Sequence, residues 1–172
     1  MLWDKWASST LSLLSEMSVI LRNVSMLKTL LIHPQILGAL GRGGHGSKVL
    51  IADGNYPIWT RHGRNAEVVY LNLAADMLKA TDVLNMILQS IPVEEAVVMA
   101  PNKTGPHRLK NEPAIFGQYR ALLDQWSPGT TLTKIERMAF YNEASTPDVC
   151  LAIATGESRI YANILLTIGV VK

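Results

Sequence analysis

Short apolar runs that favour β-strands alternate along this chain with segments of helical periodicity, and this alternation restricts the possible folds more than any other feature. Runs typical of strands are found at 48–52, 67–71, 95–99, 134–141, 149–154 and 164–170. Segments typical of helices are found at 33–40, 80–91 and 113–126. The alternation predicts a layered α/β domain with a mainly parallel sheet, and the strand-rich last third predicts that the sheet is mixed.

The first 25 residues differ in pattern from the rest of the chain. Large apolar side chains recur there at helical spacing from Trp3 to Val24, with serines between them. Glu16 interrupts the apolar core that a secretory signal peptide would need. We therefore expect a helical extension at 1–25 followed by one domain at 26–172, since a chain of 172 residues is short for two full domains.

Charge and composition exclude several classes of protein. Sixteen Lys and Arg against fourteen Asp and Glu leave a net charge of +2, too small for a nucleic-acid binder that depends on neutralising phosphates. The longest stretch without charged residues, 29–41, is well short of the about 20 apolar residues of a membrane span. The single cysteine, Cys150, cannot form an internal disulfide, which favours a reducing compartment such as the cytoplasm. The charged fraction of 17% is low, which suggests that another subunit covers part of the surface.

A glycine-rich segment at 41–46 has the G-x-G-x-x-G spacing of dinucleotide-binding loops. Such a loop must follow a strand and open a helix, because the phosphates bind at the helix N-terminus. Here a predicted helix comes first and a strand follows, so the glycines indicate a helix end and a turn instead. His45 lies in this turn, and a structural role and a catalytic role for it are equally open.

Asp53 directly follows the strand predicted at 48–52. Ligands of open α/β sheets bind at the carboxyl ends of strands, so Asp53 is a candidate binding residue, although Asp beside Gly54 is also common in turns. His45 precedes the same strand, which puts the two side chains at its opposite ends. They share one site only if the loop folds back or a neighbouring chain supplies one of them.

Two further pairs of polar residues interrupt apolar segments. Within the strand predicted at 134–141, the two-residue period places Arg137 and Tyr141 on one face, where an ordinary surface pair is the alternative interpretation. Tyr161 and Asn163 are also two residues apart, just before the last apolar run. No His or Cys spacing suggests a metal site, and no G-x-S-x-G motif suggests a serine hydrolase.

Five short motifs follow one another along the chain: Gly44-His45-Gly46, Ile51-Ala52-Asp53 with Tyr56-Pro57, Ile135-Glu136-Arg137 with Ala139-Phe140-Tyr141, Ala154-Thr155-Gly156-Glu157, and Tyr161-Ala162-Asn163-Ile164. In this order and spacing they resemble the D-ribose pyranase / L-fucose mutarotase family. The resemblance extends from about Met26 to Val171. One departure is that an acid usually follows the Gly-His-Gly of the family, whereas this chain has Ser47.

The resemblance implies a three-layer α/β/α sandwich in which His45 is the proton donor. It implies that Asp53, Arg137, Tyr161 and Asn163 bind the sugar. Interconverting sugar anomers moves no electrons and breaks no bond to carbon other than C–O, so neither a redox cofactor nor a metal is needed. The resemblance also implies a homo-oligomeric ring, commonly a decamer, with sites where neighbouring subunits meet. A monosaccharide is then the expected partner, rather than a nucleic acid or a membrane.

The expected activity is that of an isomerase, a mutarotase that interconverts the anomers of a fucose-like monosaccharide. This reaction takes a proton from the anomeric hydroxyl and delivers one to the ring oxygen, so it moves no electrons. A neutral imidazole can take and give protons near pH 7, which suits His45. Tyr141 is expected as a second acid or a stacking face, and it matches the fucose branch of the family.

Three alternatives stay open. Tyr161-Ala162-Asn163 is spelled as in D-ribose pyranases, which would interconvert pyranose and furanose forms. A sugar-binding protein without catalysis is the second alternative, because Ser47 could leave His45 poorly oriented. A purely structural ring protein is the third.

Overall fold

The computed structural model describes residues 27–105 and 108–171. The helical extension predicted at 1–25 lies outside the described residues. The chain divides into two compact units, residues 1–32 and 33–172. The described residues of the first unit form bends and contain no helix or strand. All described helices and strands belong to the second unit.

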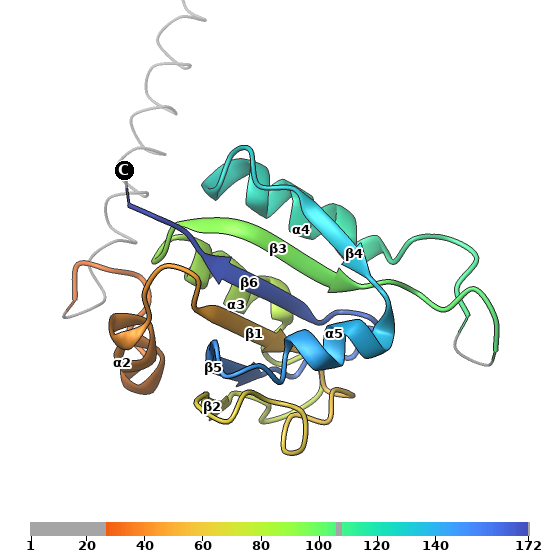
Figure 1. Ribbon diagram of the computed structural model, residues 1–172, viewed down its shortest axis with the longest axis horizontal. Coiled ribbons are helices and arrows are strands. Elements are labelled where there is room, and N and C mark those ends of the chain that lie inside the picture. Colours follow the sequence, from red (N-terminus) through yellow and green to blue (C-terminus); the bar gives the residue numbers. More distant parts are fainter. Residues whose placement is uncertain (1–26, 106–107, 172) are drawn as a thin grey trace, which may run out of the picture. The chain divides into compact units, whose positions relative to one another are not determined.

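The second unit is built on a six-stranded sheet with the strand order β2-β5-β1-β6-β3-β4 (Figure 1). The strands are β1 (Lys48–Ala52), β2 (Glu67–Tyr70), β3 (Val93–Met99), β4 (Leu132–Ile135), β5 (Val149–Ala154) and β6 (Ile164–Ile168). The described helices are α2 (Pro34–Arg42), α3 (Ala80–Leu88), α4 (Ala114–Trp126) and α5 (Arg137–Glu143). The strands predicted at 48–52 and 149–154 and the helix predicted at 113–126 are confirmed to within one residue.

One strand of the sheet runs against all the others. β1 pairs in parallel with β5, β5 with β2, and β3 with β4, whereas β6 pairs antiparallel with both β1 and β3. The other five strands therefore share one direction, which confirms a mixed and mainly parallel sheet. It follows that β6 begins at the edge of the sheet where the other five strands end.

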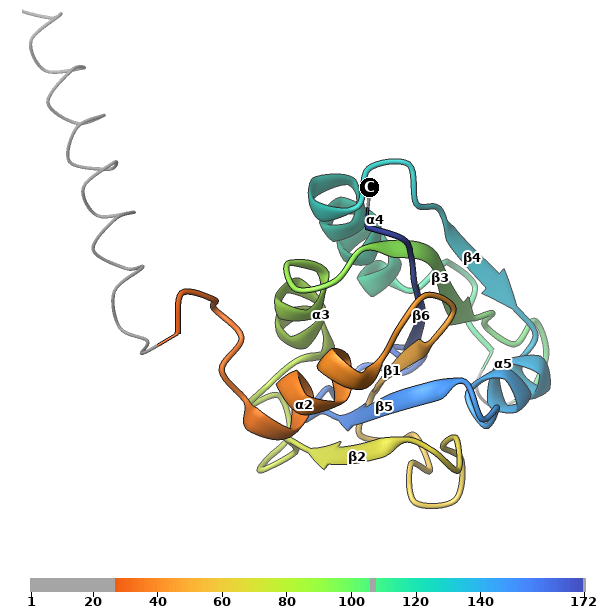
Figure 2. The ribbon, with the colours of Figure 1, turned by 60° about the vertical axis from the view of Figure 1, so that its left-hand side comes forward.

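Helices lie on both faces of this sheet. α3 and α4 pack against each other and cover one face, while α5 lies on the opposite face (Figures 1 and 2). α2 packs against β2 and β5. The largest side chains that are fully buried between these layers are Tyr119, Phe116 and Phe140. The arrangement is the three-layer α/β/α sandwich expected from the sequence.

Local sequence explains where the helices begin. α2 has Pro34 in its first turn, where the missing N–H of proline has no cost, and α4 begins directly after Pro113. At the start of α3, the Asp82 carboxylate accepts the backbone N–H of Lys79 over 3.0 Å. Of the described helices, none is both long enough and apolar enough to cross a membrane.

The strand predicted at 134–141 is wrong beyond Ile135. β4 ends there, and the next residues form the helix α5. The Glu136 side chain caps this helix, because one carboxylate oxygen accepts the backbone N–H groups of Met138 and Ala139 over 2.7 and 3.1 Å. The sequence did not reveal this helix, because seven residues are too few to show a helical period and Glu is not a preferred capping residue.

An ion pair with a buried carboxylate and a partly exposed guanidinium fixes the connection between β5 and β6. The Glu157 side chain is fully buried, and both its oxygens accept hydrogen bonds from the Arg159 guanidinium over 2.8 and 2.7 Å. Burial raises the pKa of Glu157, but the hydrogen bonds and the charge of Arg159, together with a backbone hydrogen bond from Ala80, outweigh this effect, so the net pKa is lowered. The Glu157 carbonyl also accepts the N–H of Gly54, which ties this connection to the loop after β1.

We predict that Arg159→Ala lowers the free energy of unfolding by about 3 kcal/mol at pH 7, because it leaves a buried carboxylate without its charged partner. Since the folded-state pKa of Glu157 is lowered, the contribution of the pair is present above the usual pKa of glutamate and is lost as the pH falls through the lowered value. Urea unfolding between pH 3 and pH 7 measures both effects. Arg120→Ala, which breaks the exposed ion pair with Glu112, is the control and should cost less than about 1 kcal/mol. An equal loss in the two variants would contradict the assignment.

A candidate sugar site at the carboxyl edge of the sheet

A small cavity opens at the edge of the sheet where the parallel strands end and β6 begins. Its volume is about 220 Å³, smaller than the roughly 300–1,000 Å³ of pockets for drug-sized ligands, so it suits a small molecule. It is lined by Asp53, Asn55, Tyr56, Met99, Arg137, Tyr141, Ile160, Tyr161 and Asn163. Five of the six residues predicted for the site are thus brought together, and the sixth, His45, is not among them.

Asp53 is the acidic group of the cavity and is only 3% exposed. One carboxylate oxygen accepts the backbone N–H of Asn55 over 3.0 Å, and the other accepts that of Ala162 over 3.1 Å. Burial raises the pKa of Asp53 to about 6, because these backbone donors offset the loss of hydration only in part. Above that pH the side chain is a fixed carboxylate, which is a strong acceptor for hydroxyl groups.

Asn163 lies beside Asp53 with its amide held in one orientation. Its side-chain oxygen accepts the backbone N–H of Asp53 over 2.8 Å, and an N–H donor can pair only with the oxygen of the amide. The amide nitrogen is therefore the part of Asn163 that can donate into the cavity. Together, Asp53 and Asn163 offer one acceptor and one donor side by side.

The backbone at Tyr161 is held in an unusual conformation. Its φ is 63°, in the left-handed region that a bulky residue seldom adopts. Hydrogen bonds on both sides hold it there: the Tyr161 hydroxyl accepts the N–H of Asn102 over 3.0 Å, and the next carbonyl, that of Ala162, accepts the Tyr119 hydroxyl over 2.7 Å. Strain of this kind is typical of functional sites, and the residue that bears it here lines the cavity.

Arg137 and Tyr141 come from successive turns of α5. In a helix, residues four apart lie on the same face. Arg137 and Tyr141 therefore still share a face, although the prediction placed them in a strand. The Arg137 guanidinium lies 3.5 Å from the Tyr141 hydroxyl, and this contact raises the pKa of Arg137. The guanidinium carbons of Arg137 and Arg61 lie 5.7 and 5.6 Å from the centre of the Tyr141 ring. The ring is thus positioned by two cations.

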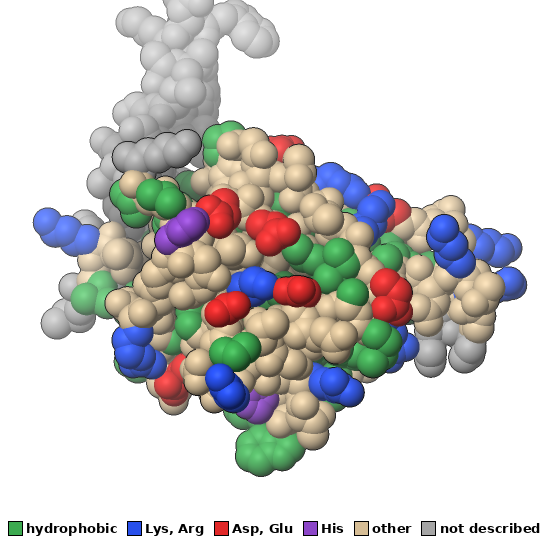
Figure 3. Space-filling model, viewed as in Figure 1, with side chains coloured by type: hydrophobic (Ala, Val, Ile, Leu, Met, Phe, Trp, Pro, Cys, Tyr) green, Lys and Arg blue, Asp and Glu red, His purple; other side chains and the backbone are tan. Residues whose placement is uncertain are grey.

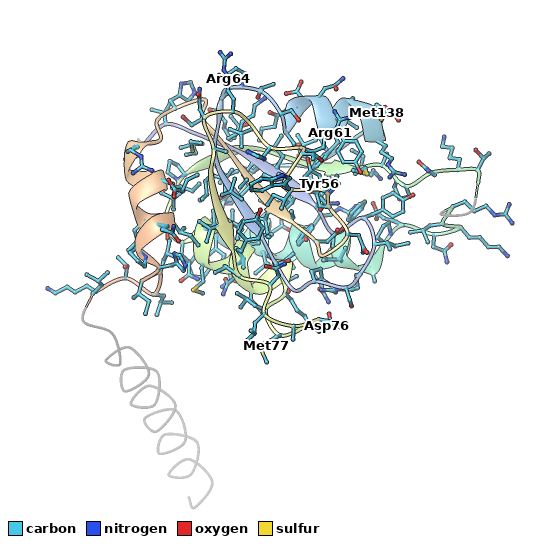
Figure 4. The ribbon with its side chains drawn as sticks, turned by 90° about the horizontal axis from the view of Figure 1, so that it is seen from below. Tyr56, Arg61, Arg64, Asp76, Met77 and Met138 are labelled. Atoms are coloured by element: carbon cyan, nitrogen blue, oxygen red, sulfur yellow. The ribbon has the colours of Figure 1, made fainter. Side chains whose placement is uncertain are left out.

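The loop after β1 supplies an aromatic wall that the sequence analysis did not assign to the site. The Tyr56 ring lies 5.5 Å from the Tyr141 ring, and its hydroxyl donates to the Arg61 carbonyl over 2.9 Å. In Figure 4, Tyr56 lies among the interior side chains, whereas Arg64 of the same loop points away from the domain. Burial raises the pKa of Tyr56, so its phenol stays protonated at neutral pH.

Four of the lining residues were not predicted from the sequence, and they differ in how strongly the sequence pointed to them. Tyr56 lies in one of the motifs that carried the resemblance, and Asn55 follows Asp53 in the same turn, so both were within reach of the sequence. Met99 ends β3 and could have been found from its place at a carboxyl edge. Ile160 had no sequence signal, because only the path of the connection between β5 and β6 brings it to the cavity.

His45 lies at the opposite edge of the sheet. It precedes β1, whereas Asp53 follows it, and the five residues of β1 alone span roughly 15 Å at about 3.3 Å per residue. The His45 ring nitrogen Nε2 lies 3.0 Å from a Glu94 carboxylate oxygen at the start of β3. The loop therefore does not fold back, and within one chain His45 is not part of the cavity.

The described residues give little support to a metal or a polyanion. Nowhere in 27–105 or 108–171 do three His, Cys, Asp or Glu side chains gather in a way that could hold a metal ion. On the face seen in Figure 3, acidic, basic and apolar side chains of the described residues are interspersed. The face in this view therefore offers no uniform basic surface for nucleic acid.

Known proteins resemble this chain over most of its length. The chain is 30% identical to the human fucose mutarotase over 145 residues, which cover 81% of this chain and 90% of that protein. The mouse fucose mutarotase is also 30% identical, over 143 residues that cover 80% of this chain and 89% of that protein.

Solved structures share the fold. The crystal structure of the fucose mutarotase from Streptococcus pneumoniae in complex with L-fucose has a TM-score of 0.67 at 27% identity and covers 82% of this chain and 95% of that one. The structure of Bacillus subtilis RbsD complexed with D-ribose has a TM-score of 0.66 at 22% identity and covers 86% of this chain and 100% of that one. Residues 26–171 match the RbsD / FucU transport protein family, and the chain therefore belongs to that family.

Proposed function

We propose that this chain is an isomerase, a mutarotase that interconverts the anomers of a fucose-like monosaccharide without a cofactor. The observation that carries the proposal is the cavity in which a buried carboxylate and an oriented amide meet, walled by tyrosine rings and a guanidinium. A sugar needs such a combination, because its hydroxyls require both donors and acceptors while its ring face packs on aromatic side chains. The similarity to fucose mutarotases of two mammals and of Streptococcus pneumoniae supports the same reaction.

The chemistry requires one proton to move between two oxygens of one carbon. A base removes the proton from the anomeric hydroxyl, the bond from the anomeric carbon to the ring oxygen breaks, and the ring oxygen receives a proton. The open-chain carbonyl turns about a single bond and the ring closes on its other face. Each atom is returned, so one group that alternates between base and acid can serve both steps.

The cavity residues divide into binding and catalytic roles. Asp53 accepts and Asn163 donates hydrogen bonds to sugar hydroxyls, while Arg137 offers the rigid donor fork of a guanidinium. Tyr161 adds a wall to the binding site. Tyr141, with its hydroxyl beside Arg137, serves as a second acid or a stacking face.

The proton shuttle is His45 of a neighbouring copy. Within one chain His45 is at the wrong edge of the sheet, so a site that uses it needs a second subunit. The low charged fraction suits a covered surface, as do two exposed apolar side chains, Ile160, which lines the cavity, and Met138, which follows Arg137 on α5. We therefore propose a homo-oligomer, with a decameric ring preferred, and keep the cytoplasm as the expected location.

A D-ribose pyranase is the second candidate. Tyr161-Ala162-Asn163 favours it, since the sequence is spelled there as in pyranases. Tyr141 favours a fucose-type sugar instead. Saturation-transfer NMR on L-fucose and D-ribose separates the two, because only the true substrate shows faster exchange between its ring forms. Binding without faster exchange on any sugar would favour a non-catalytic sugar-binding protein.

We predict that His45→Ala abolishes the acceleration of anomer exchange, a loss of about 10²- to 10⁴-fold, because it removes the group that carries the proton. Sugar affinity should change only a few-fold, since Asp53, Arg137 and Asn163 remain in place. Saturation-transfer NMR measures the exchange, and titration calorimetry measures the affinity. His33→Ala, at the start of α2, is the control and should keep full exchange. Full exchange in His45→Ala would refute the shuttle.

We predict that Asp53→Asn weakens sugar binding by about tenfold or more at pH 7.5, because a hydrogen bond to a charged acceptor contributes about 1.5–3 kcal/mol. Since the pKa of Asp53 is raised to about 6, the carboxylate is present above that pH and is lost as the pH falls through it. The affinity of the wild type for the sugar should therefore fall as the pH is lowered and the carboxylate is lost, whereas the affinity of Asp53→Asn should not change in this way. Calorimetric titrations at pH 5, 6 and 7.5 test this, with Asp148→Asn at the other edge of the sheet as the control. The same pH dependence in wild type and Asp53→Asn would rule out this role.

We predict that His45→Ala and Asp53→Asn subunits regain activity when they are refolded together, at a sugar concentration low enough that Asp53→Asn alone shows little exchange. If each site takes His45 from one subunit and Asp53 from its neighbour, about one quarter of the sites in a random mixture contain both native residues. Exchange NMR on the mixture measures the recovery, and light scattering measures the mass of the assembly. A mixture as inactive as its components would argue against a shared site, as would a monomeric mass at micromolar concentration.

A further inference from the structure

The turn that carries His45 has a defined geometry. The Ser47 N–H donates to the Gly44 carbonyl over 3.0 Å, and Gly46 between them has a φ of 81°. These are features of a type II turn, with His45 at its second position and glycine at its third. The Ser47 hydroxyl accepts the Gly44 N–H over 3.2 Å, so Ser47 closes the turn and does not contact the imidazole as an acid could.

The turn is anchored to β6. The Gly46 N–H donates to the Ile168 carbonyl over 2.9 Å, and the Ile168 N–H donates to the Ser47 carbonyl over 2.8 Å. β6 also pairs with β3, so the His45 turn and the start of β3 are held on two sides of the same strand. A side chain at the start of β3 can therefore keep a fixed position relative to His45.

Glu94 is that side chain, and an irregularity in the sheet directs it. Val93 pairs with Ile168 and Glu95 pairs with Thr167, so Glu94 is one extra residue on β3. Such a β-bulge redirects a side chain, and bulges are common next to active sites. Glu94 Oε2 lies 3.0 Å from His45 Nε2. Glu95 instead accepts the Thr167 hydroxyl over 3.1 Å.

The segment that follows β6 leaves room for the bulge in β3. A Cβ atom at Gly169 would lie 3.3 Å from both the Cβ and the backbone nitrogen of Glu94, closer than ordinary van der Waals contact. The Gly169 N–H donates to the Pro92 carbonyl over 2.9 Å, which fixes the two backbones on either side of the extra residue. The placement of Glu94 is thus set by the backbone of β3 and β6.

We propose that Glu94 is a positioning residue for His45 that supplies the acid absent at Ser47. A carboxylate can only accept a hydrogen bond, so its contact with Nε2 selects the tautomer that carries the proton there. Nδ1 is then the atom that takes the proton from the anomeric hydroxyl and returns it to the ring oxygen. The role in catalysis rests on the proposed function, whereas the tautomer is a property of the chain by itself.

The tautomer is measured by solid-state ¹⁵N NMR of full-length protein labelled at histidine, at pH 8, with His45→Ala to assign the signals. We expect the neutral His45 ring to carry its proton on Nε2 in the wild type. Glu94→Gln should give a mixture of tautomers, because an amide can either accept or donate. Glu95→Gln, a neighbouring and similarly exposed acid, should leave the spectrum unchanged. A proton on Nδ1 in the wild type, or an unchanged spectrum in Glu94→Gln, would overturn the proposal whatever the activity.

Exchange kinetics test the consequence for catalysis. Glu94→Gln should lower kcat by about tenfold, a part of the 10²–10⁴-fold that acid–base catalysis supplies, while KM stays within about twofold. Glu94→Asp should restore part of kcat, and the thermal unfolding midpoint should not change in either variant. An equal loss of kcat in Glu95→Gln, or a loss confined to KM, would contradict a positioning role. A wild type that accelerates exchange of no sugar would refute the proposed function, and the NMR result would still decide the contact.

Discussion

The antiparallel strand β6 is the element on which both the sheet and the candidate site depend. It joins the β2-β5-β1 half to the β3-β4 half, because it pairs with β1 on one side and β3 on the other. Its reversed direction brings its first residues to the edge where the parallel strands end. Asn163 and Asp53 become neighbours for this reason, although they are 110 residues apart.

The cavity is held in shape by hydrogen bonds that are independent of any ligand. Both oxygens of Asp53 are occupied by backbone donors, and the amide of Asn163 is oriented by the Asp53 N–H. The unusual backbone of Tyr161 is fixed between Asn102 and Tyr119. Each of these groups is therefore positioned before a sugar arrives, which reduces the entropy lost on binding.

In the proposed function, the two edges of the sheet hold two parts of one reaction. The carboxyl edge carries groups that suit a sugar, and the opposite edge carries His45 with Glu94. A strand of five residues keeps these parts too far apart to act on one molecule. A closed ring of identical subunits could solve this problem by bringing the His45 edge of one copy to the cavity of the next.

The sequence by itself determined the layered α/β fold, the mixed sheet and five of the cavity residues. Periodicity revealed most of the strands, and the order of the motifs identified the five cavity residues. Only the structure revealed α5 in place of a strand end, and contacts between distant segments decided the place of Ile160 in the cavity and of Glu94 beside His45. Short helices and bulges leave no periodic signal, because a single capping carboxylate or one extra residue sets them.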